Sequence, residues 1–266
     1  MQRFRSLLSI INQRARAAWL IIAFFAFWQL APSIGLANPV YLPPLSRVLE
    51  EAVTVGFGQL AHDVLISVWR IILGFFIAIV AAIPLGFVLA GAFRWVSELL
   101  APLMTFLSQI PPFILFPVFI IILGVGETGI LAVIIWSVFW PTLFSTIAGS
   151  HHIDPLYVKS ARSMGADRLS IFIDVIIPSA LPQIMTGMRN GLTLCFMMLI
   201  GAETMGASSG MGWEINMAQR MAVIPRIYLM ALIVAVVGLL INYLFEWLEQ
   251  TIVVWRDDAQ RELVVT

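Results

Sequence analysis

Long apolar runs constrain this chain more than any other feature of its sequence. A helix needs about 20 apolar residues to cross a bilayer, and six runs of roughly that length occur, at 17–36, 66–92, 100–123, 128–149, 185–205 and 227–249. Only 11% of the 266 residues are charged, whereas soluble domains carry roughly a quarter. We therefore predict an all-α membrane protein with about six transmembrane helices, forming a single transmembrane domain over residues 1–266.

The third run contains three prolines, which predict a break within it. Pro111, Pro112 and Pro117 each lack a backbone N–H, so each removes one hydrogen bond and bends a helix. Membranes tolerate such breaks where neighbouring helices satisfy the freed backbone groups. We expect an interrupted helix over 100–123.

The distribution of arginine and lysine predicts the orientation, because cytoplasmic segments collect these residues. With the N-terminus inside, eleven of the 15 fall in inner segments and four in outer segments. The inner group is Arg3, Arg5, Arg14, Arg16, Arg94, Lys159, Arg162, Arg168, Arg189, Arg256 and Arg261, and the outer group is Arg47, Arg70, Arg220 and Arg226. Both termini are therefore predicted to be cytoplasmic, in a multi-pass membrane protein.

A charged segment, the loop 151–182, interrupts the apolar pattern on the predicted cytoplasmic side. Asp154 is a good helix N-cap, and Pro155 suits the first helical position. Gly165 is placed to stop this helix, after about Met164, in the left-handed conformation. The loop is thus predicted to begin with a short helix that has its own start and stop signals.

A second short helix is predicted after the glycine. Asp167 can cap its first turn. Because Pro178 cannot continue a helix interior, we expect this helix to end at about Ile176. The loop is therefore predicted to be a helix–turn–helix on the inner membrane surface.

The first of these helices carries an apolar stripe between cations. Tyr157, Ala161 and Met164 are spaced i, i+4 and i+7, which places them on one helix face. Arg162 and Lys159, the only lysine of the chain, flank the stripe. Two interpretations fit this pattern: docking to another protein, or a helix that rests on lipid headgroups.

The spacing within the loop resembles the cytoplasmic signature of ABC importer permeases. That signature runs Glu-Ala-Ala, three residues, Gly, nine residues, then Ile-x-Leu-Pro; here Lys159-Ser160-Ala161, Gly165 and Val175-Ile176-Ile177-Pro178 occupy these positions. Further segments resemble the branch of permeases for nitrate, sulfonates, taurine and bicarbonate. They are Ser67–Arg70 with Gly74, Ile110–Pro112, Ala180–Pro182, Thr186–Arg189, Gly201–Ala207 and Ser209–Gly212.

The resemblance implies a type I importer bundle in a bacterial inner (plasma) membrane, and a set of partners. Two permease copies, expected to be identical, would face each other, and a periplasmic or lipid-anchored binding protein would deliver the substrate. A cytoplasmic ABC ATPase dimer would bind the loop 151–182 as a coupling helix. The implied substrate is a small oxyanion or sulfonate, such as nitrate, taurine, an alkanesulfonate or bicarbonate; the alternative is a vitamin, a pyrimidine precursor or an aromatic acid.

The same resemblance identifies the residues expected to couple the chain to its ATPase. They are Asp154, Tyr157, Lys159, Ser160, Ala161, Met164, Gly165, Ala166 and Pro178. One departure is clear, because Lys159 stands where the signature has Glu. A salt bridge made by that Glu cannot be transferred to this chain.

The sequence predicts a transport subunit rather than an enzyme. It has no G-x-x-x-x-G-K-[ST] motif, so ATP would be bound and hydrolysed by the partner. No cofactor, metal site, catalytic residue or nucleic-acid partner is predicted, the last because the net charge is zero. A channel without an ATPase is a further reading, which the loop argues against.

A rival reading comes from Gly206–Gly210, which matches the G-x-S-x-G pattern of serine hydrolases around Ser208. Such a nucleophile needs a histidine within hydrogen-bond reach. The predicted topology places His151 and His152 on the opposite side of the membrane, and His62 outside the apolar slab. The hydrolase therefore remains a remote alternative.

Polar residues within the apolar runs are candidates for the translocation path, because charge inside a membrane is costly and usually functional. Glu203 is interpreted as a gate or structural ion pair, or else as a carboxylate satisfied by backbone donors. Arg189 is interpreted as an anchor reaching the membrane surface, or else as an anion ligand, and Arg70 as a similar anchor. Thr193 and Met197 are expected to line a central cavity, with helix packing as the alternative.

Overall fold

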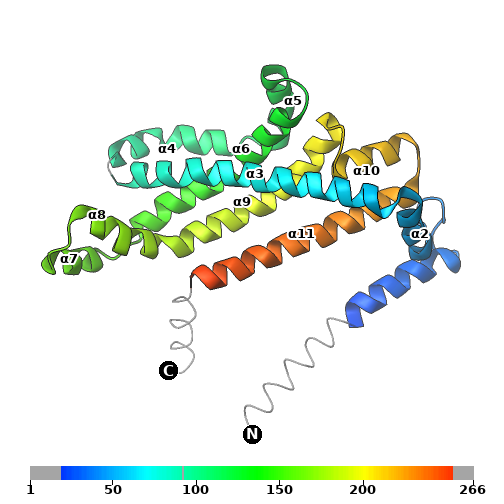
Figure 1. Ribbon diagram of the computed structural model, residues 1–266, viewed down its shortest axis with the longest axis horizontal. Coiled ribbons are helices and arrows are strands. Elements are labelled where there is room, and N and C mark those ends of the chain that lie inside the picture. The colour runs from blue at the N-terminus through cyan, green and yellow to red at the C-terminus, as the bar shows by residue number, and fades with distance from the viewer. Residues whose placement is uncertain (1–18, 92, 254–266) are drawn as a thin grey trace, which may run out of the picture. The chain divides into compact units, whose positions relative to one another are not determined.

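The computed structural model describes residues 19–91 and 93–253 (Figure 1). Every regular element in these ranges is a helix, which confirms the predicted all-α class. The arginines at both ends of the chain, on which much of the predicted orientation rests, lie outside these ranges; they are Arg3, Arg5, Arg14, Arg16, Arg256 and Arg261. The cytoplasmic location of both termini stays a prediction.

Four helical spans among the described residues are long and apolar enough to cross a membrane. They are α3 (Phe57–Ala90), α6 (Glu127–His151), the continuous span Arg168–Gly206 and α11 (Ile224–Ile252). A fifth is formed if the bent pair α4 and α5 is one span. The first predicted run, 17–36, corresponds to a shorter apolar helix over Trp19–Ser33, so the described residues hold four or five such spans where about six were predicted.

The predicted break in the third run is present between α4 (Arg94–Ser108) and α5 (Pro112–Leu123), which are bent by 91°. Pro111 precedes α5 with extended backbone, and Pro112 stands in the first helical turn, where the missing N–H leaves no hydrogen bond unmade. Pro117 lies inside α5 without ending it. The break therefore comes from Pro111 and Pro112.

The described residues form two compact units. The smaller unit contains α2 (Leu45–Val55) and the first turns of α11. Within it the Trp28 indole donates to the Pro43 carbonyl at 3.0 Å, and Arg226 pairs with Glu51 at 2.9 Å. The first contact ties the segment after the helix Trp19–Ser33 back to that helix, and the second ties α2 to α11.

The larger unit is centred on the packing of α6 against α9 (Ile177–Gly206). Glycines permit this close approach: a Cβ added to Gly187 would lie 2.4 Å from Ser145 Cβ, and one added to Gly191 would lie 3.0 Å from Val138 Cα. Small residues four apart allow membrane helices to pack closely. The pair therefore forms the buried centre of this unit.

The loop 151–182 begins as predicted and then departs from the prediction. The first helix is α7 (Pro155–Ser163), with the Asp154 Oδ1 accepting the Leu156 N–H at 2.8 Å. Gly165 has φ +87°, which is the expected left-handed stop. The Asp167 Oδ1 accepts the Ser170 N–H at 3.0 Å as α8 (Arg168–Ile171) begins.

The predicted end of the second helix before Pro178 is wrong. The π-helical segment η1 (Phe172–Ile176) joins α8 to α9 without a break. Within it the Ile177 N–H donates to the Phe172 carbonyl, five residues earlier. This wider turn places Pro178 in the first turn of α9, where its missing N–H is tolerated.

Candidate functional site

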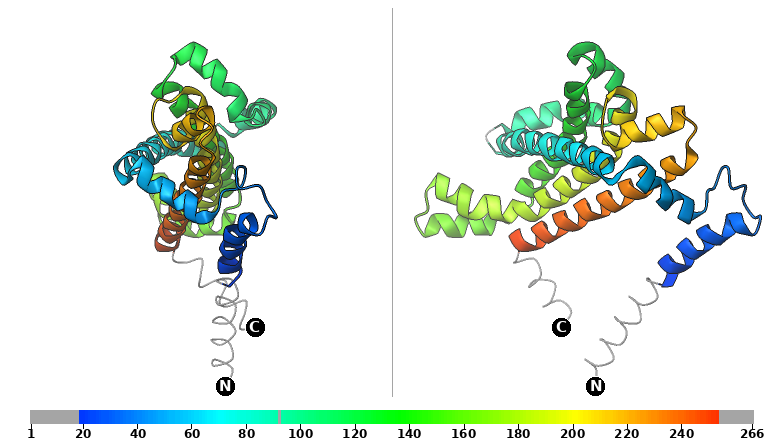
Figure 2. Two further views of the ribbon diagram at one scale, coloured as in Figure 1. Left: turned by 90° about the vertical axis from the view of Figure 1, so that its right-hand side faces the viewer. Right: turned by 45° about the vertical axis from the view of Figure 1, so that its right-hand side comes forward.

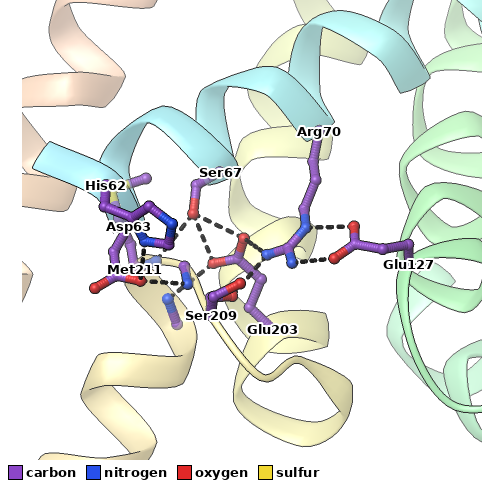
Figure 3. Close-up of polar contacts among 10 residues, drawn as sticks. His62, Asp63, Ser67, Arg70, Glu127, Glu203, Ser209 and Met211 are labelled. Atoms are coloured by element: carbon purple, nitrogen blue, oxygen red, sulfur yellow. Dashed lines mark hydrogen bonds and ion pairs between the residues drawn. The ribbon is translucent and has the colours of Figure 1, made fainter. Parts of the chain in front are cut away.

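A buried ion pair joins α3 to the end of α9. Arg70 Nη1 lies 2.6 Å from Glu203 Oε1, and the side chains are 1% and 0% exposed (Figure 3). Burying charges is costly unless they are paired and hydrogen-bonded. The Ser67 hydroxyl lies 2.7 and 2.9 Å from the two Glu203 oxygens, and the Gly212 N–H donates to Oε2 at 2.9 Å. The sequence allowed two interpretations of Glu203, a gate or structural ion pair and a carboxylate satisfied by backbone donors. In the structure Glu203 has both an ion pair and a backbone donor.

The chain that follows α9 closes over this pair. Arg70 Nη1 donates to the Ser209 carbonyl at 2.8 Å, and the Gly210 N–H donates to Asp63 Oδ1 at 2.8 Å. Gly210 has φ +113°, and a Cβ there would lie 2.6 Å from Glu203 Oε1. Only glycine fits this turn without strain.

Arg70 also binds a second carboxylate. Its Nε donates to Glu127 Oε2 at 2.8 Å, and its Nη2 contacts Glu127 Oε1. Glu127 is the first residue of α6 and its side chain is 61% exposed. Figure 3 shows the guanidinium between the two carboxylates. We call Asp63, Ser67, Arg70, Glu127 and Glu203 the arginine network; it links α3, α6 and α9.

Sequence reasoning missed most of this network. Arg70 was expected to reach the membrane surface as an anchor, and that interpretation is wrong because its side chain is fully buried. Glu127 was not identified at all. The available signal was that all three residues lie on the same predicted side of the membrane: Arg70 and Glu127 at the start of a span, and Glu203 at the end of one.

The structure brings Thr193 and Met197 together on one cavity. They line a space of about 450 Å³ between α9 and the later turns of α11. Asn242 is the other polar residue on this cavity, whose remaining lining residues are apolar: Leu192, Phe196, Val234, Ala235, Gly238, Leu239 and Ile241. Thr193 and Asn242 are thus the two polar residues on an otherwise apolar space.

Arg189 is not a lining residue of this cavity, although its carbonyl accepts the Thr193 hydroxyl at 3.1 Å, and it lies far from Glu203. Its Nη2 is 2.6 Å from Glu249 Oε2 on α11, and its side chain is 35% exposed. Glu203 is fourteen positions further along α9, which is about 21 Å at the helical rise of about 1.5 Å per residue. The four predicted pathway residues therefore fall in three places: the arginine network, the α9–α11 cavity and the Arg189–Glu249 ion pair.

The predicted coupling residues lie mainly at the surface. Tyr157 and Met164 are 61% and 82% exposed. Asp154, Lys159, Ser160 and Gly165 are exposed, whereas Ala166 and Pro178 are half-buried. Ala161 is only 7% exposed, so it packs against the protein instead of joining an exposed stripe with Tyr157 and Met164. Figures 1 and 2 show α7 and α8 beyond the N-terminal end of α9.

The G-x-S-x-G match has a structural explanation. Its backbone forms the turn that closes over Arg70 and Glu203, through the Ser209 carbonyl and the Gly210 N–H. Ser208 itself is exposed. Among the described ranges, no cluster of three or more His, Cys, Asp or Glu could hold a metal ion.

Comparisons with known proteins give a consistent result. A model of the family described as "Binding-protein-dependent transport system inner membrane component" matches residues 82–254. A relative named "Probable ABC transporter permease protein" from Brucella abortus is 32% identical over 254 residues, covering 94% of this chain and 100% of the relative. The taurine transport system permease of Escherichia coli is 28% identical, with coverages of 91% and 89%.

The nitrate import permease of Synechocystis is 27% identical, covering 90% of this chain and 89% of that protein. Among solved structures, an inward-facing MetNI methionine ABC transporter matches with a TM-score of 0.61 and 17% identity. The match covers 74% of this chain and 97% of that one. This structural likeness supports the type I importer fold.

Proposed function

Because the chain belongs to the family of binding-protein-dependent transport system inner membrane components, we propose that it forms the substrate pathway of an ATP-driven importer and is coupled to a separate ATPase through α7. It is a multi-pass inner-membrane transport subunit and not an enzyme. The energy therefore has to come from the ATPase partner that this family implies.

One observation carries the proposed coupling: α7 is capped at both ends and continues into the helix that bears the candidate pathway residues. Asp154 fixes its start and Gly165 its stop. From Arg168 the chain runs as one helical span to Gly206. A displacement of α7 by a bound ATPase would therefore act on α9, along which Thr193, Met197 and Glu203 lie. Such a motion is driven only if ATP binding favours one arrangement over the other.

The proposed substrate is a small oxyanion or sulfonate, delivered by an external binding protein to a pathway formed by two copies of the chain. The relatives named for taurine, aliphatic sulfonates and nitrate support this choice. In the α9–α11 cavity, the Asn242 amide can donate to an oxyanion and the apolar lining can receive a short alkyl group. The alternative is the same importer role for a vitamin, a pyrimidine precursor or an aromatic acid.

The arginine network is proposed to be a clamp at one end of the pathway. Arg70 holds the start of α6 and the end of α9 through Glu127 and Glu203. Such a clamp would hold α3, α6 and α9 in fixed positions relative to one another at this end, while their opposite ends move with α7. In this proposal Arg189 joins α9 to α11 through Glu249 and does not bind the substrate anion.

The proposal is tested by ATPase stimulation in liposomes that contain the chain, its co-expressed ATPase and the binding protein. Taurine, an alkanesulfonate, nitrate and bicarbonate form the first substrate panel, and thiamine and benzoate represent the alternative classes. We expect at least one member of the first panel to raise ATP hydrolysis and to accumulate inside the vesicles. Stimulation by thiamine or benzoate alone would contradict the substrate class while leaving the importer role intact.

A further inference from the structure

The face of α7 that points away from the protein is polar at its centre. Ala161 is 7% exposed and marks the face that packs inward. At about 100° per residue, Leu156, Lys159 and Ser163 fall roughly opposite to it, and all three are exposed. Lys159 therefore stands at the middle of the outward face, with one apolar residue before it and a serine after it.

This outward face carries uncompensated positive charge. The α7 sequence, PLYVKSARS, contains Lys159 and Arg162 and no carboxylate. Within the part of the chain that the structure describes, neither cation has a hydrogen-bond or ion-pair partner. The two aspartates that flank the helix, Asp154 and Asp167, each accept a backbone N–H as an N-cap. The cations of α7 are therefore free to meet an external anion.

The shape of the exposed surface favours a protein groove over a lipid surface. Helices that lie in a membrane interface present a broad apolar face to the lipid. In α7 the outermost positions are Leu156, Lys159 and Ser163, whereas the large apolar side chains Tyr157 and Met164 lie nearer the Ala161 face. The outward face thus presents a cation and a single apolar side chain, Leu156, which suits a protein groove that holds a carboxylate better than it suits lipid.

We propose that α7 selects an ATPase whose docking groove presents an aspartate or glutamate to Lys159, with apolar side chains around Leu156. This inference rests on the proposed coupling through α7 and adds the chemistry of the partner. Because Lys159 stands at the position of the signature's Glu, the charge required of the groove is opposite to the one that a Glu-bearing permease would require.

The single lysine makes a direct test possible. A water-soluble carbodiimide activates a carboxylate as an O-acylisourea; the Lys159 amine attacks its acyl carbon, an amide bond forms and a urea leaves. Lys159 offers the only side-chain amine of the chain, and peptide mapping separates it from the N-terminal amine. In the purified permease–ATPase complex we expect a cross-linked product that joins Lys159 to an Asp or Glu of the ATPase.

Three variants separate the effect of the positive charge at position 159 from the reactivity of the Lys159 amine. Lys159→Arg should keep the ATPase bound but lose the cross-link, because a guanidinium forms no amide under these conditions. Lys159→Glu should weaken ATPase binding about tenfold or more, through like-charge contact, and a reciprocal Asp or Glu→Lys change in the ATPase should restore it. Arg94→Glu is the matched charge reversal. Arg94 is 68% exposed on α4, and its ion-pair partner among the described residues is its neighbour Glu98, so ATPase affinity should not change.

The possible outcomes are distinguishable. If the ATPase co-purifies but no cross-link forms at Lys159, and Lys159→Glu binds the ATPase as the wild type does, the acidic groove is refuted while the coupling stands. If the permease binds anionic-lipid vesicles through Lys159, and its affinity for the ATPase does not change when Lys159 is replaced, α7 is a membrane-surface helix. If no ATPase co-purifies at all, both the inference and the proposed function fail.

Discussion

Arg70 of α3 and Glu203 of α9 form a fully buried ion pair, with Nη1 and Oε1 2.6 Å apart. The two residues are 133 positions apart in the sequence, so the pair fixes the packing of distant segments. Glu127 extends it to α6 from the opposite side of the guanidinium. The stability of this part of the protein therefore depends on the balance of charge around Arg70.

Replacement of Arg70 by Met is expected to lower the free energy of unfolding by about 3–5 kcal/mol, because it leaves the Glu203 carboxylate buried without its counter-charge. The double variant Arg70→Met, Glu203→Met should regain part of that loss, because the buried charge is gone while the Ser67 hydroxyl and the Gly212 N–H lose their acceptor. Both are measured by denaturant unfolding in detergent. The exposed Arg94–Glu98 pair is the control, and its loss in Arg94→Met should cost less than about 1 kcal/mol. A double variant no more stable than the single one would contradict the clamp.

Gly210→Ala is expected to lower the melting temperature. Its φ of +113° is unfavourable for alanine, and the new Cβ would lie 2.6 Å from Glu203 Oε1 and 2.7 Å from Arg70 Nη1. Gly58→Ala is the matched control, because nothing lies within 4 Å of its Cβ position and alanine favours the helix. Equal melting temperatures for the two variants would show that the turn over the ion pair tolerates a side chain.

Gly165→Val is expected to abolish substrate-stimulated ATP hydrolysis while leaving the basal rate of the ATPase. Gly165 has φ +87° and nothing within 4 Å of its Cβ position, so the effect would come from backbone strain alone. A β-branched residue is strongly disfavoured in this conformation, whereas asparagine visits it. Gly165→Asn should therefore retain stimulation. Normal stimulation in Gly165→Val would show that the left-handed turn at Gly165 is not needed for coupling.

Asn242→Leu is expected to raise the KM for a transported oxyanion about tenfold or more, since a hydrogen bond to a charged group contributes roughly 1.5–3 kcal/mol. The prediction rests on Asn242 and Thr193 being the polar residues of the α9–α11 cavity. Asn242→Gln should recover part of the affinity, and ATPase binding should be normal in both variants. An unchanged KM in Asn242→Leu would place the substrate elsewhere.

Acid is expected to release the start of α8. Hydrogen bonds from Ser170 hold the pKa of Asp167 below its ordinary value, so the cap's contribution is complete above the ordinary aspartate pKa and is lost as the pH falls through the lowered one. At neutral pH the cap is therefore fully formed, and Asp167→Asn should leave coupled ATP hydrolysis unchanged. Asp167→Leu, which cannot cap, should reduce it. Equal coupled ATP hydrolysis in the two variants would show that the Asp167 cap does not contribute to coupling.

The parts of the fold that the sequence predicted well depend on local chemistry. Asp154 and Asp167 each accept an N–H only two or three residues away, and the left-handed stop at Gly165 depends on one residue's backbone. Such features can be read from a short window. Pro178 shows the limit of the same reasoning, because the π turn in η1 moved it into the first turn of α9, where a proline is allowed.

Features that depend on tertiary packing were not predictable in the same way. The Arg70 bridge joins residues 57 and 133 positions away, and no local pattern specifies which helices meet. The spacing of Tyr157, Ala161 and Met164 placed them on one face but could not tell that Ala161 packs inward. In both cases the missing information is which helix faces which neighbour.

Co-purification of the ATPase with tagged protein from detergent is the most direct test of the central claim, that α7 couples this chain to an ATP-hydrolysing partner. The comparison is wild type against a deletion of Asp154–Met164 and, in case the deletion fails to fold, against Tyr157→Asp with Met164→Asp, which alters only exposed side chains. The account predicts a Walker-A ATPase bound to the wild type and lost from variants that remain monodisperse. An ATPase retained equally by all three proteins would contradict it.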